Sequence, residues 1–303
     1  MSFQHVAIIG LGLIGGSIGL AVREHLPGVT TTGYDLDPQV RARARERMLA
    51  DAVCDDPAAA VAGADLVILC VPVGAMAAAA DAIAPGLPPG AVISDVGSLK
   101  EAIGRTLAER LPNHAIIPAH PVAGTEHSGP DAGFATLFHQ RWCIVTPPAG
   151  ADPAQVAALV AFWESLGAMV ETMDAEHHDR VLAVTSHIPH LIAYTIVGTA
   201  SELESVTRSE VIKYSAGGFR DFTRIAASDP TMWRDVFLHN REAVLDMLDR
   251  FLTDLALMRE AIRASDGETM FDVFSRTRAI RRSIVALGQD DPRPDFGRQP
   301  PPG

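Results

Sequence analysis

The segment HPVAGTEHSGP, residues 120–130, combines two histidines, a glutamate, two glycines and two prolines, without the apolar period that packing would require. His120 can do chemistry there, because an imidazole with an unperturbed pKa of about 6.5 can take a proton from an alcohol whose carbon gives up hydride. Ser98, in the segment SDVGS, can hydrogen-bond the same oxygen. These two residues form the predicted catalytic pair. An alternative stays open for each residue: His120 as a structural loop histidine, and Ser98 as the N-cap of the next helix.

A second chemical signal is the glycine turn GLGLIG, which follows an apolar run and precedes a helical pattern. Glycines at this spacing let the backbone approach a pyrophosphate, while the free amides of the helix N-terminus point at the phosphates. Asp35 follows Gly15 by 20 residues, and a carboxylate there accepts from the ribose hydroxyls and repels a 2′-phosphate, which favours NAD over NADP. The predicted NAD-binding residues are Gly10, Gly12, Leu13, Ile14, Gly15, Asp35, Val71 and Pro72.

These residues need a scaffold that brings strand ends together. Short apolar runs alternate with helical patterns through the first half of the chain, which predicts a doubly wound, mostly parallel sheet. Ligands of such sheets bind beyond the carboxyl ends of the strands, where Ser98 and His120 fall. The predicted strands of this half are 5–10, 30–35, 64–72, 91–97 and 114–121, and two later runs, 141–148 and 168–174, flank another helix.

The strand patterns stop after Asp174. Residues 175–203 and 230–264 each predict one long, largely apolar helix, the second with i, i+3, i+4 spacing. The sequence therefore predicts three parts: a Rossmann-type α/β domain over residues 1–173, an all-α domain over 174–287, and a proline-rich disordered tail over 288–303.

Composition narrows the function classes. The 303 residues carry a net charge of -12 and a pI near 5.3, which argues against nucleic-acid or anionic-membrane partners. The three cysteines lie far apart, so we expect a reducing cytoplasm and no disulfide. The N-terminus lacks a secretory leader pattern, and no run approaches 18 uninterrupted apolar residues, so secretion and membrane insertion are not expected.

The remaining histidines are weaker candidates. His187 and His190 have the i, i+3 spacing of a metal pair, but there is no HExxH pattern and no nearby acidic third ligand, so no metal is predicted. The adjacent His177 and His178 are expected to face solvent.

Several motifs together resemble the prephenate/arogenate (cyclohexadienyl) dehydrogenase family, from residue 5 to about 287. They are the glycine turn, DVGS, HPVAGTEHSG, SHIPH and GGFRDFTRIAASDPTMW, in this order. The resemblance implies a cytoplasmic NAD-dependent enzyme of tyrosine biosynthesis, which oxidatively decarboxylates prephenate, arogenate or both. It also implies a homodimer formed through the helical domain.

The resemblance assigns roles to individual residues. His120 would be the general base for the 4-hydroxyl, with Ser98 bound to the same oxygen and His187 near the substrate. Arg224 would bind a substrate carboxylate, which suits a planar guanidinium, and Asp221, one helical turn earlier, would support it. An ordinary surface ion pair remains the alternative for Arg224.

Glu126 carries a separate hypothesis. Arogenate has an ammonium where prephenate has a keto group, so a carboxylate near that group would favour arogenate. A Glu126→Gln variant assayed with both substrates tests this, and an equal loss or no loss on the two would contradict it.

Two other functions are open to this sequence. One is a 3-hydroxyacid-type NAD dehydrogenase, which would need a catalytic lysine in the helical domain, where Lys213 is the candidate. The other is a non-catalytic NAD-binding regulatory protein. Activity in a Lys213→Ala variant would argue against the first, and NADH formation from prephenate or arogenate would argue against the second.

Overall fold

The computed structural model describes residues 2–125, 127–202 and 217–286. The chain forms two compact units, residues 1–245 and 246–303. All the strands and the candidate site lie in the first unit, and the second contains most of α12 (Arg241–Arg263) and α13 (Gly267–Ala286).

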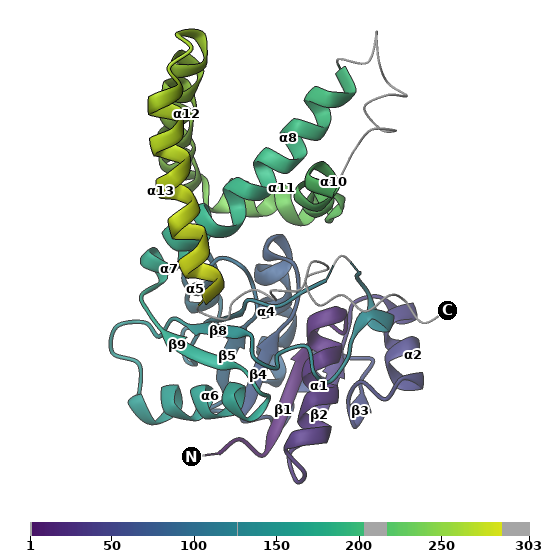
Figure 1. Cartoon of the computed structure of the whole chain (residues 1–303). Helices are drawn as coiled ribbons and strands as arrows, with labels where there is room; N and C mark the ends of the chain where they lie inside the picture. Colours follow the sequence, from purple (N-terminus) through teal and green to yellow (C-terminus); the bar gives the residue numbers. More distant parts are fainter. Residues whose placement is uncertain (1, 126, 203–216, 287–303) are drawn as a thin grey trace. The chain divides into compact units, whose positions relative to one another are not determined.

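Six parallel strands form the main sheet in the order β3-β2-β1-β4-β5-β6 (Figure 1). This order places β1 and β4 side by side, where the winding of the sheet reverses and nucleotides bind in such folds. The prediction of a Rossmann-type sheet followed by helices is confirmed. The strands are β1 (His5–Ile9), β2 (Thr30–Tyr34), β3 (Ala52–Val53), β4 (Leu66–Leu69), β5 (Val92–Asp95) and β6 (Ala115–Ile116). The helices between them are α1 (Leu13–His25), α2 (Pro38–Glu46), α3 (Pro57–Val61), α4 (Met76–Ile83) and α5 (Glu101–Arg110).

The sheet is covered on both faces because its two central strands, β1 after His5 and the whole of β4, are apolar and buried. Val6 and Ile8 of β1 pack into one hydrophobic cluster with α1, whereas Ala7 and Ile9 pack into a second cluster with α4 and α5. Successive side chains of a strand point to opposite faces, so an uninterrupted apolar run fills two cores at once. The result is a rigid sheet whose carboxyl edge can hold polar groups in fixed positions.

The predicted strand 114–121 is wrong as a single element. It forms two short strands in different sheets: β6 pairs with β5, and β7 (Ala119–Pro121) pairs antiparallel with β8 (Trp142–Val145). Pro118 lies between them and has no N–H to continue the first ladder. The small second sheet is completed by β9 (Met169–Thr172), parallel to β8 and joined to it through α6 (Pro153–Ser165).

The first long helix predicted, residues 175–203, is interrupted within its described part. It contains α7 (Ala175–Leu182), a π-helical turn (Ala183–His187) and α8 (Ile188–Glu202). Pro189 follows the π turn and has no N–H to donate to the carbonyl four residues earlier, so a local change of helical pitch is expected there. Such turns occur frequently at functional sites, and this one contains His187.

The second long helix predicted, residues 230–264, is also broken. It divides at Asn240 into α11 (Pro230–His239) and α12. Asn240 leaves helical geometry, with φ -105° and ψ 31°, and its side chain bonds elsewhere in the first unit. Before α11, the chain forms α10 (Gly217–Thr223) and a 3-10 turn, Arg224–Ala227.

Candidate active site

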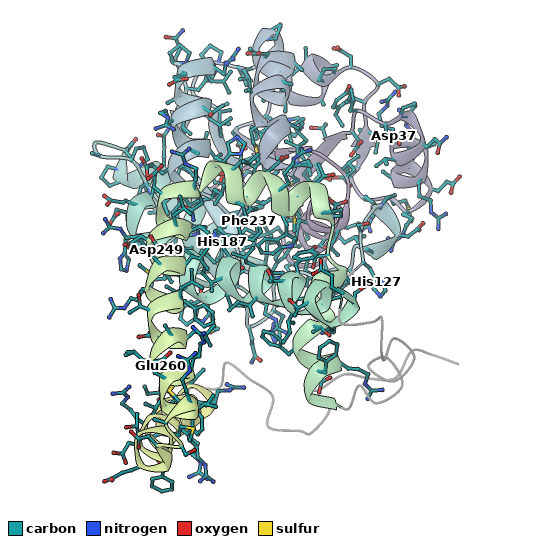
Figure 2. All side chains as sticks on the ribbon, turned by 90° about the horizontal axis from the view of Figure 1, so that it is seen from above. Asp37, His127, His187, Phe237, Asp249 and Glu260 are labelled. Atoms are coloured by element: carbon teal, nitrogen blue, oxygen red, sulfur yellow. The ribbon has the colours of Figure 1, made fainter. Side chains whose placement is uncertain are left out.

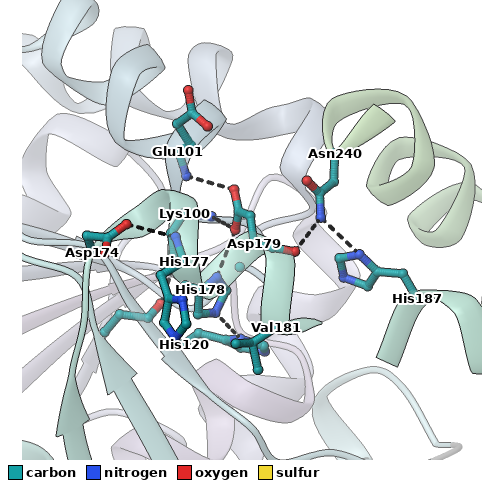
Figure 3. A network of polar contacts seen from close by, with 12 residues as sticks. Lys100, Glu101, His120, Asp174, His177, His178, Asp179, Val181, His187 and Asn240 are labelled. Carbon is teal, nitrogen blue, oxygen red and sulfur yellow. Dashed lines mark hydrogen bonds and ion pairs between the residues drawn. The ribbon is translucent and has the colours of Figure 1, made fainter. Parts of the chain in front are cut away.

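His120 begins a chain of three polar side chains, the relay, that also contains His178 and Asp179 (Figure 3). His120 lies on β7 and is nearly buried, at 8% exposure. Its Nδ1 lies 2.9 Å from His178 Nε2, and His178 Nδ1 lies 2.8 Å from Asp179 Oδ1. The relay therefore joins the second sheet to the first turns of α7.

The hydrogen bonds that Asp179 accepts determine which nitrogen of each relay histidine carries the proton. Its Oδ1 also accepts from the Lys100 amide over 2.8 Å, and its Oδ2 accepts from the Glu101 amide over 3.1 Å, so Asp179 caps α5 as a carboxylate. A carboxylate only accepts, so His178 Nδ1 must donate and its Nε2 must accept. His120 Nδ1 then donates to His178, which leaves His120 Nε2 as the nitrogen with a lone pair.

The surroundings of His120 keep its imidazole neutral. Burial is the main reason that the pKa of His120 lies well below 6.5. The charge of Lys100, and those that His178 and His187 carry when protonated, act in the same direction. Burial also lowers the pKa of His178, although the hydrogen bond to Asp179 opposes that shift. A neutral imidazole with a free lone pair is a general base at neutral pH.

His187 is tied to the relay by Asn240. The Asn240 amide nitrogen Nδ2 donates to the Asp179 carbonyl oxygen over 3.0 Å and lies 3.1 Å from His187 Nδ1. His187 Nδ1 is then the acceptor, and its Nε2 carries the proton. This Nε2 is buried and has no hydrogen-bond partner among the described residues. His187 therefore holds an unused N–H donor inside the first unit, where Figure 2 labels it among the helices.

The buried histidines give the fold a sensitivity to acid. Burial lowers the pKa of His187 to about 4 from 6.5. Between these values the unfolded chain binds a proton that the folded chain does not, so stability falls as the pH drops from about 6.5 towards 4, by about 3 kcal/mol at most for this side chain. Urea unfolding at pH 7.5, 6 and 5 should show this fall, and a His187→Asn variant should show less of it. An identical pH dependence in the variant would contradict the assignment.

The prediction that His178 faces solvent is wrong, whereas His177 is exposed. His178 shares the buried side of α7 with Leu182, four residues later, and both are almost completely buried. This i, i+4 spacing is the signal in the sequence that could have identified His178. No local pattern in the sequence indicates the contacts of Asp179, Lys100 and Asn240, because these contacts join distant segments.

The other predicted residues have these positions. Ser98 lies partly exposed in the loop after β5, and it does not cap α5, whose N-cap is Lys100. Asp221 lies in α10, and Arg224 begins the 3-10 turn that follows this helix. Burial is the main cause that lowers the pKa of His190, and the charge of Arg224 also lowers it. His190 in turn stacks on Trp233, with ring centroids 3.7 Å apart. Glu126 and Lys213 lie outside the described residues.

The glycine turn has the shape that a dinucleotide needs. Gly10 has a φ of +101°, and a Cβ there would lie 2.4 Å from the Cys70 carbonyl oxygen. A Cβ on Gly15 would lie 1.9 Å from the Gly10 carbonyl oxygen, whereas one on Gly12 meets nothing within 4 Å. The N-terminus of α1 has no side-chain cap. Open space beside uncapped amides fits a pyrophosphate.

The other predicted cofactor residues lie next to the glycine turn. Asp35 follows β2, and its Oδ2 accepts from the Leu11 amide over 2.8 Å, which joins it to the glycine turn. Leu13 and Ile14 begin α1, and Val71 and Pro72 follow β4 at the neighbouring strand end. The predicted cofactor residues therefore lie at the carboxyl ends of the neighbouring strands β2, β1 and β4 or at the start of α1.

Asp35 provides a test of cofactor choice. An Asp35→Asn variant should bind NAD roughly tenfold more weakly, because hydrogen bonds to a charged group contribute about 1.5–3 kcal/mol, and it should discriminate less against NADP. Fluorescence titration with both dinucleotides measures this. Asp37→Asn, which keeps the N-cap of α2, is the matched control. An unchanged NAD to NADP ratio in Asp35→Asn would refute the role of Asp35.

Comparison with known proteins now decides the family. The family model described as "Prephenate dehydrogenase, nucleotide-binding domain" matches residues 18–172, and "Prephenate dehydrogenase, dimerization domain" matches residues 174–276. The chain belongs to the prephenate dehydrogenase family. It is an NAD-dependent oxidoreductase, which confirms the predicted cofactor and excludes a purely regulatory NAD-binding protein.

Individual relatives agree with this assignment. The chain is 49% identical to cyclohexadienyl dehydrogenase of Zymomonas mobilis, over 93% of this chain and 96% of that one. It is 33% identical to prephenate dehydrogenase of Bacillus subtilis, over 92% and 76% of the two chains. The crystal structure of prephenate dehydrogenase from Aquifex aeolicus with hydroxyphenyl propionate and NAD+ is similar, with a TM-score of 0.86, 32% identity and coverage of 94% and 99%.

Across the described ranges 2–125, 127–202 and 217–286, no group of three His, Cys, Asp or Glu side chains could hold a metal ion. The polar contacts of the candidate site thus come from the relay, Asn240, Lys100 and His187.

Proposed function

We propose that this enzyme oxidatively decarboxylates prephenate, arogenate or both in tyrosine biosynthesis, with His120 as the general base. The observation that carries this proposal is the relay, which leaves His120 Nε2 unprotonated at the carboxyl edge of the strands. A proton acceptor in this position suits a substrate whose alcohol carbon gives up hydride. The cytoplasm is the compartment that we propose.

One base is enough for the protons of this reaction. The ring C4 hydrogen leaves as hydride, and His120 Nε2 takes the proton of the 4-hydroxyl as the C4 carbonyl forms. The ring carboxylate then leaves as CO2, the electrons of the broken C–C bond make the ring aromatic, and His120 returns its proton to the phenolate oxygen. NAD, when bound at the glycine turn, would supply the hydride acceptor. His178 and Asp179 stabilise the imidazolium while it carries the second proton.

Other residues would bind the substrate. We assign Ser98 to the 4-hydroxyl and Arg224, supported by Asp221, to a carboxylate. His187 has a buried Nε2–H without a partner among the described residues, which makes it a donor for a substrate oxygen. Glu126 remains the candidate that selects between an ammonium and a keto group.

A direct assay tests the function. Purified protein with NAD and prephenate, and separately with arogenate, should produce NADH and CO2 in equal amounts. Side-by-side kcat/KM values then give the preferred substrate. Failure with both substrates would refute the proposal. Activity with a 3-hydroxyacid that depends on Lys213 would support the alternative enzyme instead.

The oligomeric state that we propose is a homodimer. The helical run Ala175–Glu202 is long and apolar enough, by length and composition alone, to cross a membrane, and 28% of its most apolar window is buried. Helices at subunit interfaces meet the same criterion, and these residues lie in the segment matched by the dimerization-domain model. We therefore assign this exposed apolar surface to a partner subunit rather than to a lipid bilayer.

The second unit, taken by itself, also exposes apolar surface. A groove of about 350 Å³ lies along α12, whose surface carries the exposed Asp249 and Glu260 that Figure 2 labels. Light scattering should give a mass of twice the 32.2 kDa of one chain, and a monomer at assay concentration would contradict the dimer. The groove is lined by Leu252, Leu255, Ala256, Met258, Arg259 and Ile262.

A further inference from the structure

Lys100 is fully buried at the start of α5, which is rare for a lysine unless it is paired. Its Nζ donates to Asp95 Oδ2 over 2.5 Å and to the Ala119 carbonyl oxygen over 2.7 Å. Its main-chain amide donates to Asp179 Oδ1 over 2.8 Å. One residue thus contacts the backbone immediately before His120 and the carboxylate that ends the relay (Figure 3).

Stability alone gives no reason for an ion pair in this place. The desolvation cost of two buried charges commonly equals or exceeds their attraction, and apolar residues of similar volume often stabilise a core as well or better. The pair is also incompletely bonded, because Asp95 Oδ1 is buried without a hydrogen-bond partner among the described residues. The position of Lys100 between both ends of the relay points to a role in the site.

We propose that Lys100 is a positioning residue, which fixes the backbone before His120 and the Asp179 carboxylate, and places a buried cation close to both relay histidines. The proposal rests on the proposed function, since it concerns how His120 is held for proton transfer. Asp95 ends β5 of the main sheet and Ala119 lies on β7, so the two bonds of Lys100 Nζ also join the second sheet to the first.

The charge of Lys100 acts on protonation as well as on position. After burial, it is among the charges that lower the pKa of His120 and of His178. Burial lowers the pKa of Lys100 itself, and the Asp95 carboxylate opposes that shift. The other groups that act on these histidines are Asp95 of β5, Asp179 of α7 and His187 of the π turn. The Cys143 thiol of β8 is kept neutral because burial raises its pKa.

The test compares pH profiles of kcat and kcat/KM for three variants with the wild type. Lys100→Met removes the cation, and Asp95→Asn/Lys100→Met also removes the carboxylate that would otherwise be left unpaired. Arg110→Met removes an exposed cation from the far end of the same helix, where a pair with Asp81 contributes little. NAD affinity is measured for all of them, to report on the fold.

We expect both Lys100 variants to lose roughly 10- to 100-fold in kcat, because small displacements of a reacting group are costly, with KM changed less than about threefold. The acid limb of kcat/KM should move up by about one pH unit in Lys100→Met, since less positive charge opposes protonation of His120. It should move less in the double variant, which also loses the negative charge of Asp95. Arg110→Met should match the wild type.

Three outcomes would overturn the proposal: an acid limb that stays in place in Lys100→Met, a higher KM with unchanged kcat, or the loss of folded, NAD-binding protein in both Lys100 variants. The last would mean that Lys100 serves the fold alone. A wild-type protein that forms no NADH from either substrate would instead overturn the proposed function, so the two failures are distinguishable.

Discussion

A His120→Asn variant should lose roughly 10²- to 10⁴-fold in kcat, the range that a positioned general base contributes. The asparagine amide can still donate towards His178 Nε2, so the relay keeps a donor at this position, but no side-chain atom remains that can take the 4-hydroxyl proton. Steady-state kinetics with the preferred substrate measures the loss. NAD affinity should stay within a few-fold of wild type, because the glycine turn is untouched.

His127→Asn is the matched control for this variant. His127 belongs to the same segment but is exposed, and Figure 2 labels it at the surface of the first unit. It should retain wild-type kinetics. A His120→Asn enzyme within tenfold of the wild-type kcat would show that another group takes the proton.

Asp179→Asn should reduce kcat by up to roughly 10⁴-fold, the loss seen when an amide replaces the carboxylate behind a catalytic imidazole. If the new amide nitrogen faces His178, it meets another donor, so the proton of His178 must move from Nδ1 to Nε2. His178 Nε2 then donates to His120 Nδ1, and the proton of His120 moves to Nε2. If the amide oxygen faces His178, the nitrogen meets the Glu101 amide, and the negative charge that stabilises an imidazolium is still lost. Either orientation weakens the base.

The readout that separates this role from a structural one is the tautomer itself. Nitrogen-15 NMR of histidine-labelled protein should show His120 protonated at Nδ1 in the wild type, and a changed pattern in Asp179→Asn. Glu176→Gln, an exposed change on the same helix, is the control and should leave both the spectrum and kcat unchanged. A wild-type His120 protonated at Nε2 would refute the direction of the relay.

Much of the nucleotide-binding half could be predicted because its signals are local. Gly10, Gly12 and Gly15 need only a strand before them and a helix after them, and the uninterrupted apolar runs of the strands indicate a sheet covered on both faces. The errors occurred where one residue changed the geometry of an element. Pro118 separated two strands, Pro189 followed a π turn, and Asn240 divided a helix.

By itself, the sequence determined the doubly wound parallel sheet, the glycine turn for NAD, the family, and His120 as the candidate base. Each of these depends on residues close together in the chain or on motifs in a fixed order. Only the tertiary structure decided how His120 is held. The relay joins residues 58 positions apart, the Lys100 to Asp179 contact spans 79, and the Asn240 contacts span 61 and 53. Hydrogen-bond direction and burial arise only when such distant segments pack together, so no local pattern contains them.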